Sequence, residues 1–239
     1  MPHIKVMLKI APILLALLYG LIYYRFSIWK TRSELNSKSS ELADPTLRAM
    51  CESMANVLDL EQVKVHIYEI DPVNGLAAPD GRIFITRGFF KKYVANEVSA
   101  EEMASVIAHE LGHVALGHSR RRMIDFSGQN AIRAALGMVL GRIVPVVGVW
   151  LAGFLTSMLA ARLSRQDEYE ADAYAAALLI KTGIGVEAQK TLLAKLEALV
   201  GSSGQPLAWL MSHPKAVDRI AAIEEFFGLF CPLNLIIRI

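Results

Sequence analysis

The feature that most constrains this chain is an H-E-x-x-H pattern formed by His109, Glu110 and His113. Residues four apart project from the same face of an α-helix, so the two imidazoles can bind one tetrahedral zinc ion together. Glu110 then lies beside the metal, where its carboxylate can take a proton from a water that zinc has made acidic. The pattern predicts a helical metal site with Zn²⁺ as the cofactor, one ion per chain.

The surrounding residues favour a helix at this position. Ser99 and Glu102 have the spacing of a capping box. An apolar stripe follows at Met103, Val106, Ile107, Leu111, Val114 and Ala115. The alternative is a buried helix whose histidines bond to core polar groups. It gives no reason for the charged Glu110, because burying an unpaired carboxylate is costly.

Composition limits the partners of the chain. Its 239 residues suffice for one substantial domain plus a membrane anchor. Because 54% of the residues are hydrophobic and only 20% are charged, we expect part of the chain to contact membrane lipid. The net charge is +2 and no Lys/Arg-rich patch contains interleaved aromatics, so we expect no nucleic-acid partner. The oligomeric state is not predicted. Cys51 and Cys231 are too few for a disulfide framework and are expected as buried free thiols, with pairing in an oxidising compartment as the alternative.

An uncharged run at residues 10–24, bounded by Lys9 and Arg25, predicts an N-terminal transmembrane helix within residues 1–29. A cleaved signal peptide is the alternative, but no small-x-small cleavage site follows the run. Basic residues on both sides leave the orientation poorly determined. We expect anchoring in a bacterial inner membrane or its equivalent, with the catalytic domain on the periplasmic side.

Beyond the anchor, a polar linker is expected at residues 30–43, a domain at 44–228 and an apolar tail at 229–239. The tail can add a strand or contact lipid. Within the domain, Asp44 and Pro45 predict the start of a helix. Segments that alternate or carry turn residues predict strands at residues 62–70, 74–78 and 82–86. The expected fold class is therefore α+β, mostly helical, with a small β-sheet.

The strand fragment before the metal helix is a candidate substrate site. Pro79 indicates that this fragment is an edge strand. An extended peptide could add to that edge as a further strand, and a plain hairpin is the alternative. The residues expected to bind substrate are Asn74, Gly75, Leu76, Ala77 and Ala78.

Residues 131–163 are strongly apolar, with no charge from Ile143 to Ala161. Hydropathy predicts a transmembrane helix there, but one crossing would separate His109 and His113 from any ligand downstream. Two crossings need about 40 residues plus a turn. We therefore expect a helical hairpin that does not span the membrane. Its expected helix breakers are Gly137, Gly141, Pro145, Gly148 and Gly153.

A third protein ligand is needed for zinc, and four carboxylates in the segment 164–174 are candidates. On a helix, Glu168 and Asp172 share one face, so one can bind the metal while the other supports a histidine. Asp167 and Glu170 point elsewhere. The alternative is a solvated acidic face. His118 lies off the ligand face and is not predicted to be a ligand.

Four segments in this order carry a resemblance to a known family. They are the run from Asn74 to Gly88, His109–His113, Ser164-Arg165 with Glu168-x-x-x-Asp172, and Ser212-His213-Pro214 followed by Arg219-Ile220. Across about residues 44–225 the chain resembles the gluzincin metallopeptidases that include HtpX, the CAAX prenyl protease, BepA and the mitochondrial Oma protease. The short segment between His113 and Glu168 is most similar to the peripheral BepA and Oma members.

The resemblance implies zinc on His109, His113 and Glu168, with Glu110 as general base and Asp172 behind the ligands. Gly75 departs from the Ala of the family pattern. His213 could simply cap the helix after Pro214. The resemblance instead implies a site role, either a hydrogen bond to the oxyanion of the tetrahedral intermediate or a fourth zinc ligand in a latent state.

The expected function is that of a membrane-anchored zinc endopeptidase that hydrolyses peptide bonds of unfolded or membrane-associated proteins in protein quality control. Its partner would be a protein or peptide substrate. The alternative is a zinc-stabilised, chaperone-like binding module with little proteolytic activity.

Overall fold

The computed structural model describes residues 18, 21–22, 24–78, 80–118, 121, 147–203 and 215–230. The chain forms two compact units. One comprises Met1–Ser37 and Arg120–Met158, and its described N-terminal part is helical over residues 24–37. The other comprises Lys38–Ser119 and Leu159–Ile239 and contains the sheet and all the described residues predicted to form the site.

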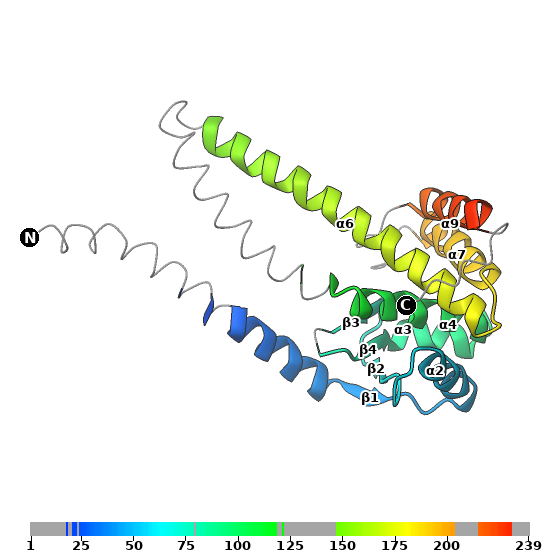
Figure 1. Ribbon diagram of the computed structural model, residues 1–239. Helices are drawn as coiled ribbons and strands as arrows, with labels where there is room; N and C mark the ends of the chain where they lie inside the picture. The colour runs from blue at the N-terminus through cyan, green and yellow to red at the C-terminus, as the bar shows by residue number, and fades with distance from the viewer. Residues whose placement is uncertain are drawn as a thin grey trace, which may run out of the picture. The chain divides into compact units, whose positions relative to one another are not determined.

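A four-stranded sheet lies in the second unit (Figure 1). Its strands are β1 (Ser39–Glu41), β2 (Val65–Tyr68), β3 (Gly75–Ala77) and β4 (Ile83–Thr86), in the order β1-β2-β4-β3. β2 and β4 pair in parallel, and both outer strands pair antiparallel with their neighbours. β4 is buried along its whole length. β3 is an edge strand of this sheet, as Pro79 predicts.

Side-chain caps define the helices next to the sheet. The Asp44 carboxylate accepts a hydrogen bond of 2.9 Å from the Leu47 amide and begins α2 (Pro45–Val57), as predicted. Thr86 caps α3 (Arg87–Val94) and also bonds through its hydroxyl to both backbone groups of Asn74 at 3.0 Å. One threonine therefore ties the start of β3 to the end of β4.

The predicted metal helix is α4 (Ala100–Ala115), and its capping box is confirmed. The Ser99 hydroxyl accepts from the Glu102 amide at 3.1 Å, while the Glu102 carboxylate accepts from the Ser99 amide at 2.8 Å. Every residue from Glu102 to His113 is buried. The histidines of this helix are therefore interior groups whose polar atoms need partners.

Three further described helices follow α4 along the chain. They are α6 (Val147–Lys181), α7 (Glu187–Ser203) and α9 (Ala216–Phe230). α7 packs against α4, and α9 packs against α7 (Figure 1). A Cβ atom on Gly112 would lie 3.0 Å from both the Cα and the carbonyl oxygen of Ala171. Glycine at this position therefore lets α4 and α6 approach closely enough to share one site.

Several segments differ from the expectation. Residues 30–43, expected to form a linker, are helical up to residue 37 and then contribute β1, which pairs with β2. Gly153 does not break the helix, contrary to the prediction, because it lies inside α6. Glycine costs a helix interior only about 1 kcal/mol relative to Ala, so its neighbours can outweigh it.

Other expectations fall largely outside the described residues. These include most of the predicted anchor, the first half of the apolar segment 131–163, and the tail after residue 230. Within the described part of the chain, no helix combines the length and the apolar character needed to cross a bilayer. The mostly helical α+β class with a small sheet is confirmed.

Candidate metal centre

The three predicted ligands converge at one point between α4 and α6. His109 and His113 lie one turn apart on α4, and Glu168 reaches them from α6. The Nε2 atoms of the two histidines are 3.1 Å apart, and the Glu168 carboxylate lies 3.3 Å from His109 Nε2 and 3.5 Å from His113 Nε2. All three side chains are buried. One turn of α4 and the acidic segment of α6 thus place three metal-binding side chains next to one another.

This donor set fits a zinc ion. Its three donor atoms lie within 4.8 Å of one another, so a single cation could contact all of them. Two imidazole nitrogens and one carboxylate oxygen are a ligand set that catalytic zinc uses, with a fourth position left for water or substrate.

Asp172 lies behind His109 and connects it to two more helices. Its Oδ1 atom is 3.0 Å from His109 Nδ1. Arg219, from α9, donates to both carboxylate oxygens at 2.6 Å, and Gln189, from α7, donates to Oδ1 at 3.1 Å. Arg219 is only 1% exposed, so the pair forms a buried, bidentate ion pair. We call Asp172, Gln189 and Arg219 the Asp172 network.

The charges in this network favour a cation at the centre. Burial raises the pKa of Asp172, but Arg219 and His109 outweigh that effect and hold the pKa well below its usual range. Burial lowers the pKa of His109, but its hydrogen bonds to Asp172 and Glu168 prevail and raise it to about 9. Without a metal, the carboxylates therefore keep a proton on His109. A bound cation would take the place of that positive charge.

A second group of side chains lies behind His113. His118 follows α4 and places its Nδ1 atom 2.9 Å from His113 Nδ1. Its Nε2 atom lies 3.2 Å from Glu170 Oε2 and 3.7 Å from Asp167 Oδ1, both on α6. We call His118, Asp167 and Glu170 the His118 network. The two carboxylates predicted to point away from Glu168 thus meet His118, which contacts a predicted ligand.

Glu110 lies at the junction of α4 and β3. Its side chain is buried, and a Cβ atom on Gly75 would lie 3.0 Å from Glu110 Oε1 and 2.9 Å from Val106 Cγ1. The edge strand therefore runs directly against the predicted general base. Glycine at this position, where the family pattern has alanine, leaves the Glu110 carboxylate room beside the strand.

Comparison with known proteins agrees with this geometry. Residues 41–226 match peptidase family M48. The chain belongs to peptidase family M48. It is 29% identical over 179 residues to the metalloprotease LoiP of Escherichia coli, covering 75% of this chain and 68% of LoiP. It is 28% identical over 193 residues to the E. coli metalloprotease YcaL, covering 81% of this chain and 73% of YcaL. The M48 chain is accordingly a metalloendopeptidase.

Two longer M48 relatives are matched over less than half of their length. The β-barrel assembly-enhancing protease of E. coli is 30% identical over 202 residues, which cover 79% of this chain but 40% of that protein. The mitochondrial metalloendopeptidase of Schizosaccharomyces pombe is 26% identical over 168 residues, covering 68% of this chain and 46% of that protein. These matches agree with the predicted resemblance to BepA and Oma members.

Three contributors to the M48 site were not predicted from sequence. Arg219 lies in a segment that carried the resemblance, but no role was assigned to it. The signal was an arginine in an otherwise apolar helix face, because a buried arginine requires an acid partner. Gln189 gives no comparable signal. The contact of His118 with His113 does not follow from helical periodicity, because α4 ends at Ala115 and the chain turns at Gly117, where φ is +69°. His213 lies outside the described residues.

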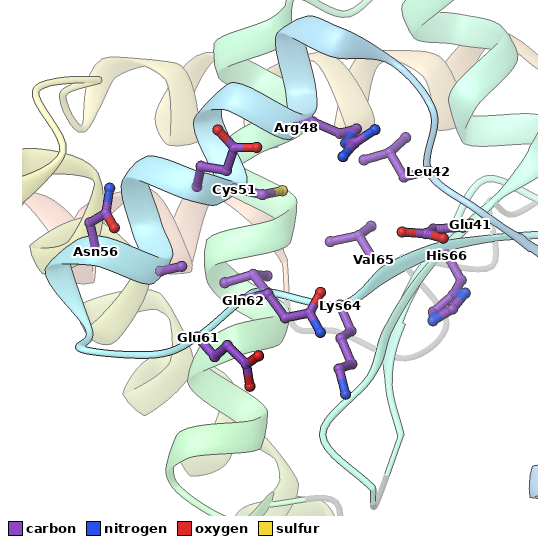
Figure 2. A pocket seen from close by; sticks show the side chains of 13 residues that line it. Glu41, Leu42, Arg48, Cys51, Asn56, Glu61, Gln62, Lys64, Val65 and His66 are labelled. Atoms are coloured by element: carbon purple, nitrogen blue, oxygen red, sulfur yellow. The ribbon is translucent and has the colours of Figure 1, made fainter.

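A hollow of about 420 Å³ lies between α2 and residues 61–66, with no predicted metal ligand in its lining (Figure 2). Its wall includes Glu41, Arg48 and Lys64, and the Cys51 side chain faces it from α2. Cys51 is a free, buried thiol, as predicted, and Cys231 lies outside the described residues. Burial and the nearby Glu52 raise the pKa of Cys51 to about 12, so the thiol stays protonated and unreactive.

Proposed function

We propose that this M48 metalloendopeptidase is a membrane-anchored zinc enzyme that hydrolyses peptide bonds of unfolded or membrane-associated proteins in protein quality control. The observation that carries the proposal is the convergence of His109, His113 and Glu168 within 4.8 Å, with Glu110 on the same helix.

In this proposal the three converging side chains bind the metal, and hydrogen bonds from behind keep the ligands in position. His109 and His113 would each offer Nε2, and Glu168 would offer a carboxylate oxygen. Zinc bound there would polarise a substrate carbonyl and make a neighbouring water acidic enough to attack near neutral pH. The His109 ring is held by Asp172, whose Oδ1 atom lies 3.0 Å from the Nδ1 atom of His109.

Glu110 is the proposed general base. Its carboxylate takes one proton from the attacking water, whose oxygen forms the new bond to the carbonyl carbon. The same carboxyl group then gives that proton to the amide nitrogen as the carbon–nitrogen bond breaks. Water is thus divided between a new carboxyl terminus and a new amine. Burial next to Gly75 keeps Glu110 in reach of a peptide lying along β3.

The proposed substrate is an extended segment that adds to the β3 edge. In the described sheet, β3 has a strand neighbour only at β4. Backbone hydrogen bonds to residues 74–78 would bind any extended sequence, while a folded chain offers few segments of that shape. Because β3 contacts α4 at Glu110, a peptide added there would present a carbonyl to the proposed metal. Unfolded proteins are therefore the favoured substrate class.

The membrane anchor is proposed from the uncharged run at residues 10–24. We place the domain on the periplasmic side of an inner membrane, with the apolar segment in contact with lipid. The E. coli relative named a β-barrel assembly-enhancing protease agrees with the proposed quality-control role. Cysteine labelling that finds residues 120 and 165 on opposite sides would exclude the non-spanning hairpin.

The test compares wild type with Glu110→Gln on an unfolded protein substrate such as reduced, alkylated albumin. The substitution should lower kcat/KM by about 10²–10⁴-fold, because it removes the base without removing a metal ligand. Zinc content should stay at one ion per chain. Glu101→Gln on the exposed face of the same helix is the matched control and should cleave like wild type. If wild type and Glu110→Gln both bind the substrate but neither cleaves it, the chaperone-like alternative is favoured instead.

His213 keeps its two proposed roles. A hydrogen bond to the oxyanion predicts that His213→Ala lowers turnover, whereas occupation of the fourth zinc position predicts that it raises basal activity. Unchanged activity would exclude both roles.

A further inference from the structure

The His118 network is a compact group of titratable side chains that the proposed chemistry does not use. α4 ends at Ala115, and the positive φ of Gly117 turns the chain so that His118 folds back onto His113. His118 is fully buried, Asp167 is nearly so, and Glu170 is partly exposed. The network therefore joins the loop after the metal helix to α6.

The contact between the His113 and His118 rings requires a proton on one of the two facing nitrogens. His113 Nδ1 and His118 Nδ1 lie 2.9 Å apart, and two ring nitrogens can bond only if one carries a proton and the other does not. A metal on His113 Nε2 needs the lone pair of that nitrogen, so the neutral His113 ring must carry its proton on Nδ1. His113 is then the donor and His118 Nδ1 the acceptor.

The same reasoning determines which nitrogen of the His118 ring carries the proton. A neutral His118 that accepts at Nδ1 carries its proton on Nε2, which lies 3.2 Å from Glu170 Oε2 and 3.7 Å from Asp167 Oδ1. Carboxylates are the acceptors that an imidazole N–H requires in a buried setting. Every ring proton in the chain from His113 to Glu170 thus has an acceptor. We propose that His118 is a positioning residue that holds His113 in the orientation and tautomer that binds the metal.

His118, Asp167 and Glu170 could themselves hold a cation, since their donor atoms lie within 4.8 Å of one another. A metal on His118 Nε2 would move the ring proton to Nδ1 and reverse the bond to His113. His113 would then carry its proton on Nε2 and could not bind the central metal. The two sites exclude each other through one shared hydrogen, and the central one has three buried donors whereas Glu170 is 38% exposed.

The inference rests on the proposed metal centre, and its test is zinc affinity measured by chelator competition on the full-length chain in detergent. The informative pair is His118→Asn and His118→Gln, which are similar in size and polarity. The Asn amide oxygen occupies the place of the His Nδ1 atom and can accept from His113. The Gln amide lies one bond further out, in the place of Nε2, and cannot.

His118→Gln should bind zinc about 10–100-fold more weakly than wild type, the loss typical of removing a partner behind a metal-binding histidine. His118→Asn should recover most of the affinity. The visible spectrum of the Co²⁺-loaded protein should change in the Gln variant and stay near wild type in the Asn variant. A merely structural role would not move this spectrum.

Equal zinc affinity in wild type and His118→Gln, or equal weakening in both variants, would overturn the inference. So would tight binding of two zinc ions per wild-type chain at the same time. If wild type binds no zinc, the proposed metal centre fails, and that outcome is distinct from a failure of the role of His118.

Discussion

His109 and His113 share one helix and one proposed metal, but the groups behind them differ in kind. Behind His109, a buried carboxylate is paired with a buried guanidinium, and α6, α7 and α9 all contribute. Behind His113, in the proposed tautomer, the His118 ring accepts the hydrogen bond, and the chain ends on two carboxylates, the buried Asp167 and the partly exposed Glu170. Both arrangements orient an imidazole, but only the first also holds a buried ion pair at the centre of the domain.

This difference separates stability from metal affinity. Removing one partner of a buried ion pair leaves an uncompensated charge, whereas removing a neutral acceptor leaves one unsatisfied donor. Changes in the Asp172 network should therefore affect both the free energy of unfolding and zinc binding. Changes at His118 should act mainly on zinc binding.

The largest expected effect is on Arg219. Arg219→Met should lower the free energy of unfolding by about 3–5 kcal/mol, because the buried Asp172 carboxylate loses the guanidinium that donates to both of its oxygens. Urea denaturation of the metal-free protein measures this directly. Arg82→Met, which removes a pair with Asp80 at the surface, is the matched control and should cost less than about 1 kcal/mol. A loss at Arg219 no greater than at Arg82 would remove the proposed contrast.

Asp172→Asn is expected to affect both properties. The Asn oxygen can still accept from His109 Nδ1, but the carboxylate charge opposite Arg219 is lost. Zinc affinity should fall by about 10–100-fold, and the unfolding transition should move to lower urea. His118→Gln should match the loss of affinity without a comparable loss of stability. If both variants lose stability to the same extent, the two networks are equivalent and our distinction is wrong.

Sequence reasoning reached the centre of this site but not its surroundings. Capping and periodicity predicted α4, and α-helical spacing placed Glu168 and Asp172 on one face of α6. The Asp172 network could not be predicted in the same way, because α7 and α9 lie far along the chain and their approach depends on tertiary packing. Gln189 looks like a surface residue in its own helix, yet it is 3% exposed.

Local rules also failed where backbone geometry changes. Helical periodicity places His118 away from the predicted ligands, but after the turn at Gly117 its ring lies 2.9 Å from His113. Gly153 was expected to break a helix that in fact continues through it. In contrast, Pro79 correctly placed β3 at the sheet edge, because proline cannot donate a ladder hydrogen bond in a central strand.

The smallest expected effects concern two glycines. Gly112 lies where α4 meets α6, and Gly75 lies beside the Glu110 carboxylate. Gly112→Ala strains the contact between α4 and α6 by about 1–3 kcal/mol. A gain in helix propensity of about 1 kcal/mol offsets part of this strain. Stability should change little, while zinc affinity falls severalfold because the ligand helices move apart.

Gly75→Ala should lower turnover and leave zinc affinity unchanged. The new methyl group meets Glu110 Oε1, and a displaced Glu110 lowers kcat while zinc affinity stays at the wild-type value. Peptidase assays and chelator competition on both variants measure the contrast. A fall in zinc affinity for Gly75→Ala, or a normal one for Gly112→Ala, would show that these contacts do not divide the site in this way.

The most direct test of the proposed centre is anomalous X-ray diffraction at the zinc edge from crystals of the zinc-loaded protein. We expect one peak per chain, bonded to His109 Nε2, His113 Nε2 and Glu168, with His118 Nδ1 facing His113. A peak among His118, Asp167 and Glu170 in place of the central one, or no peak at the central position, would contradict the account.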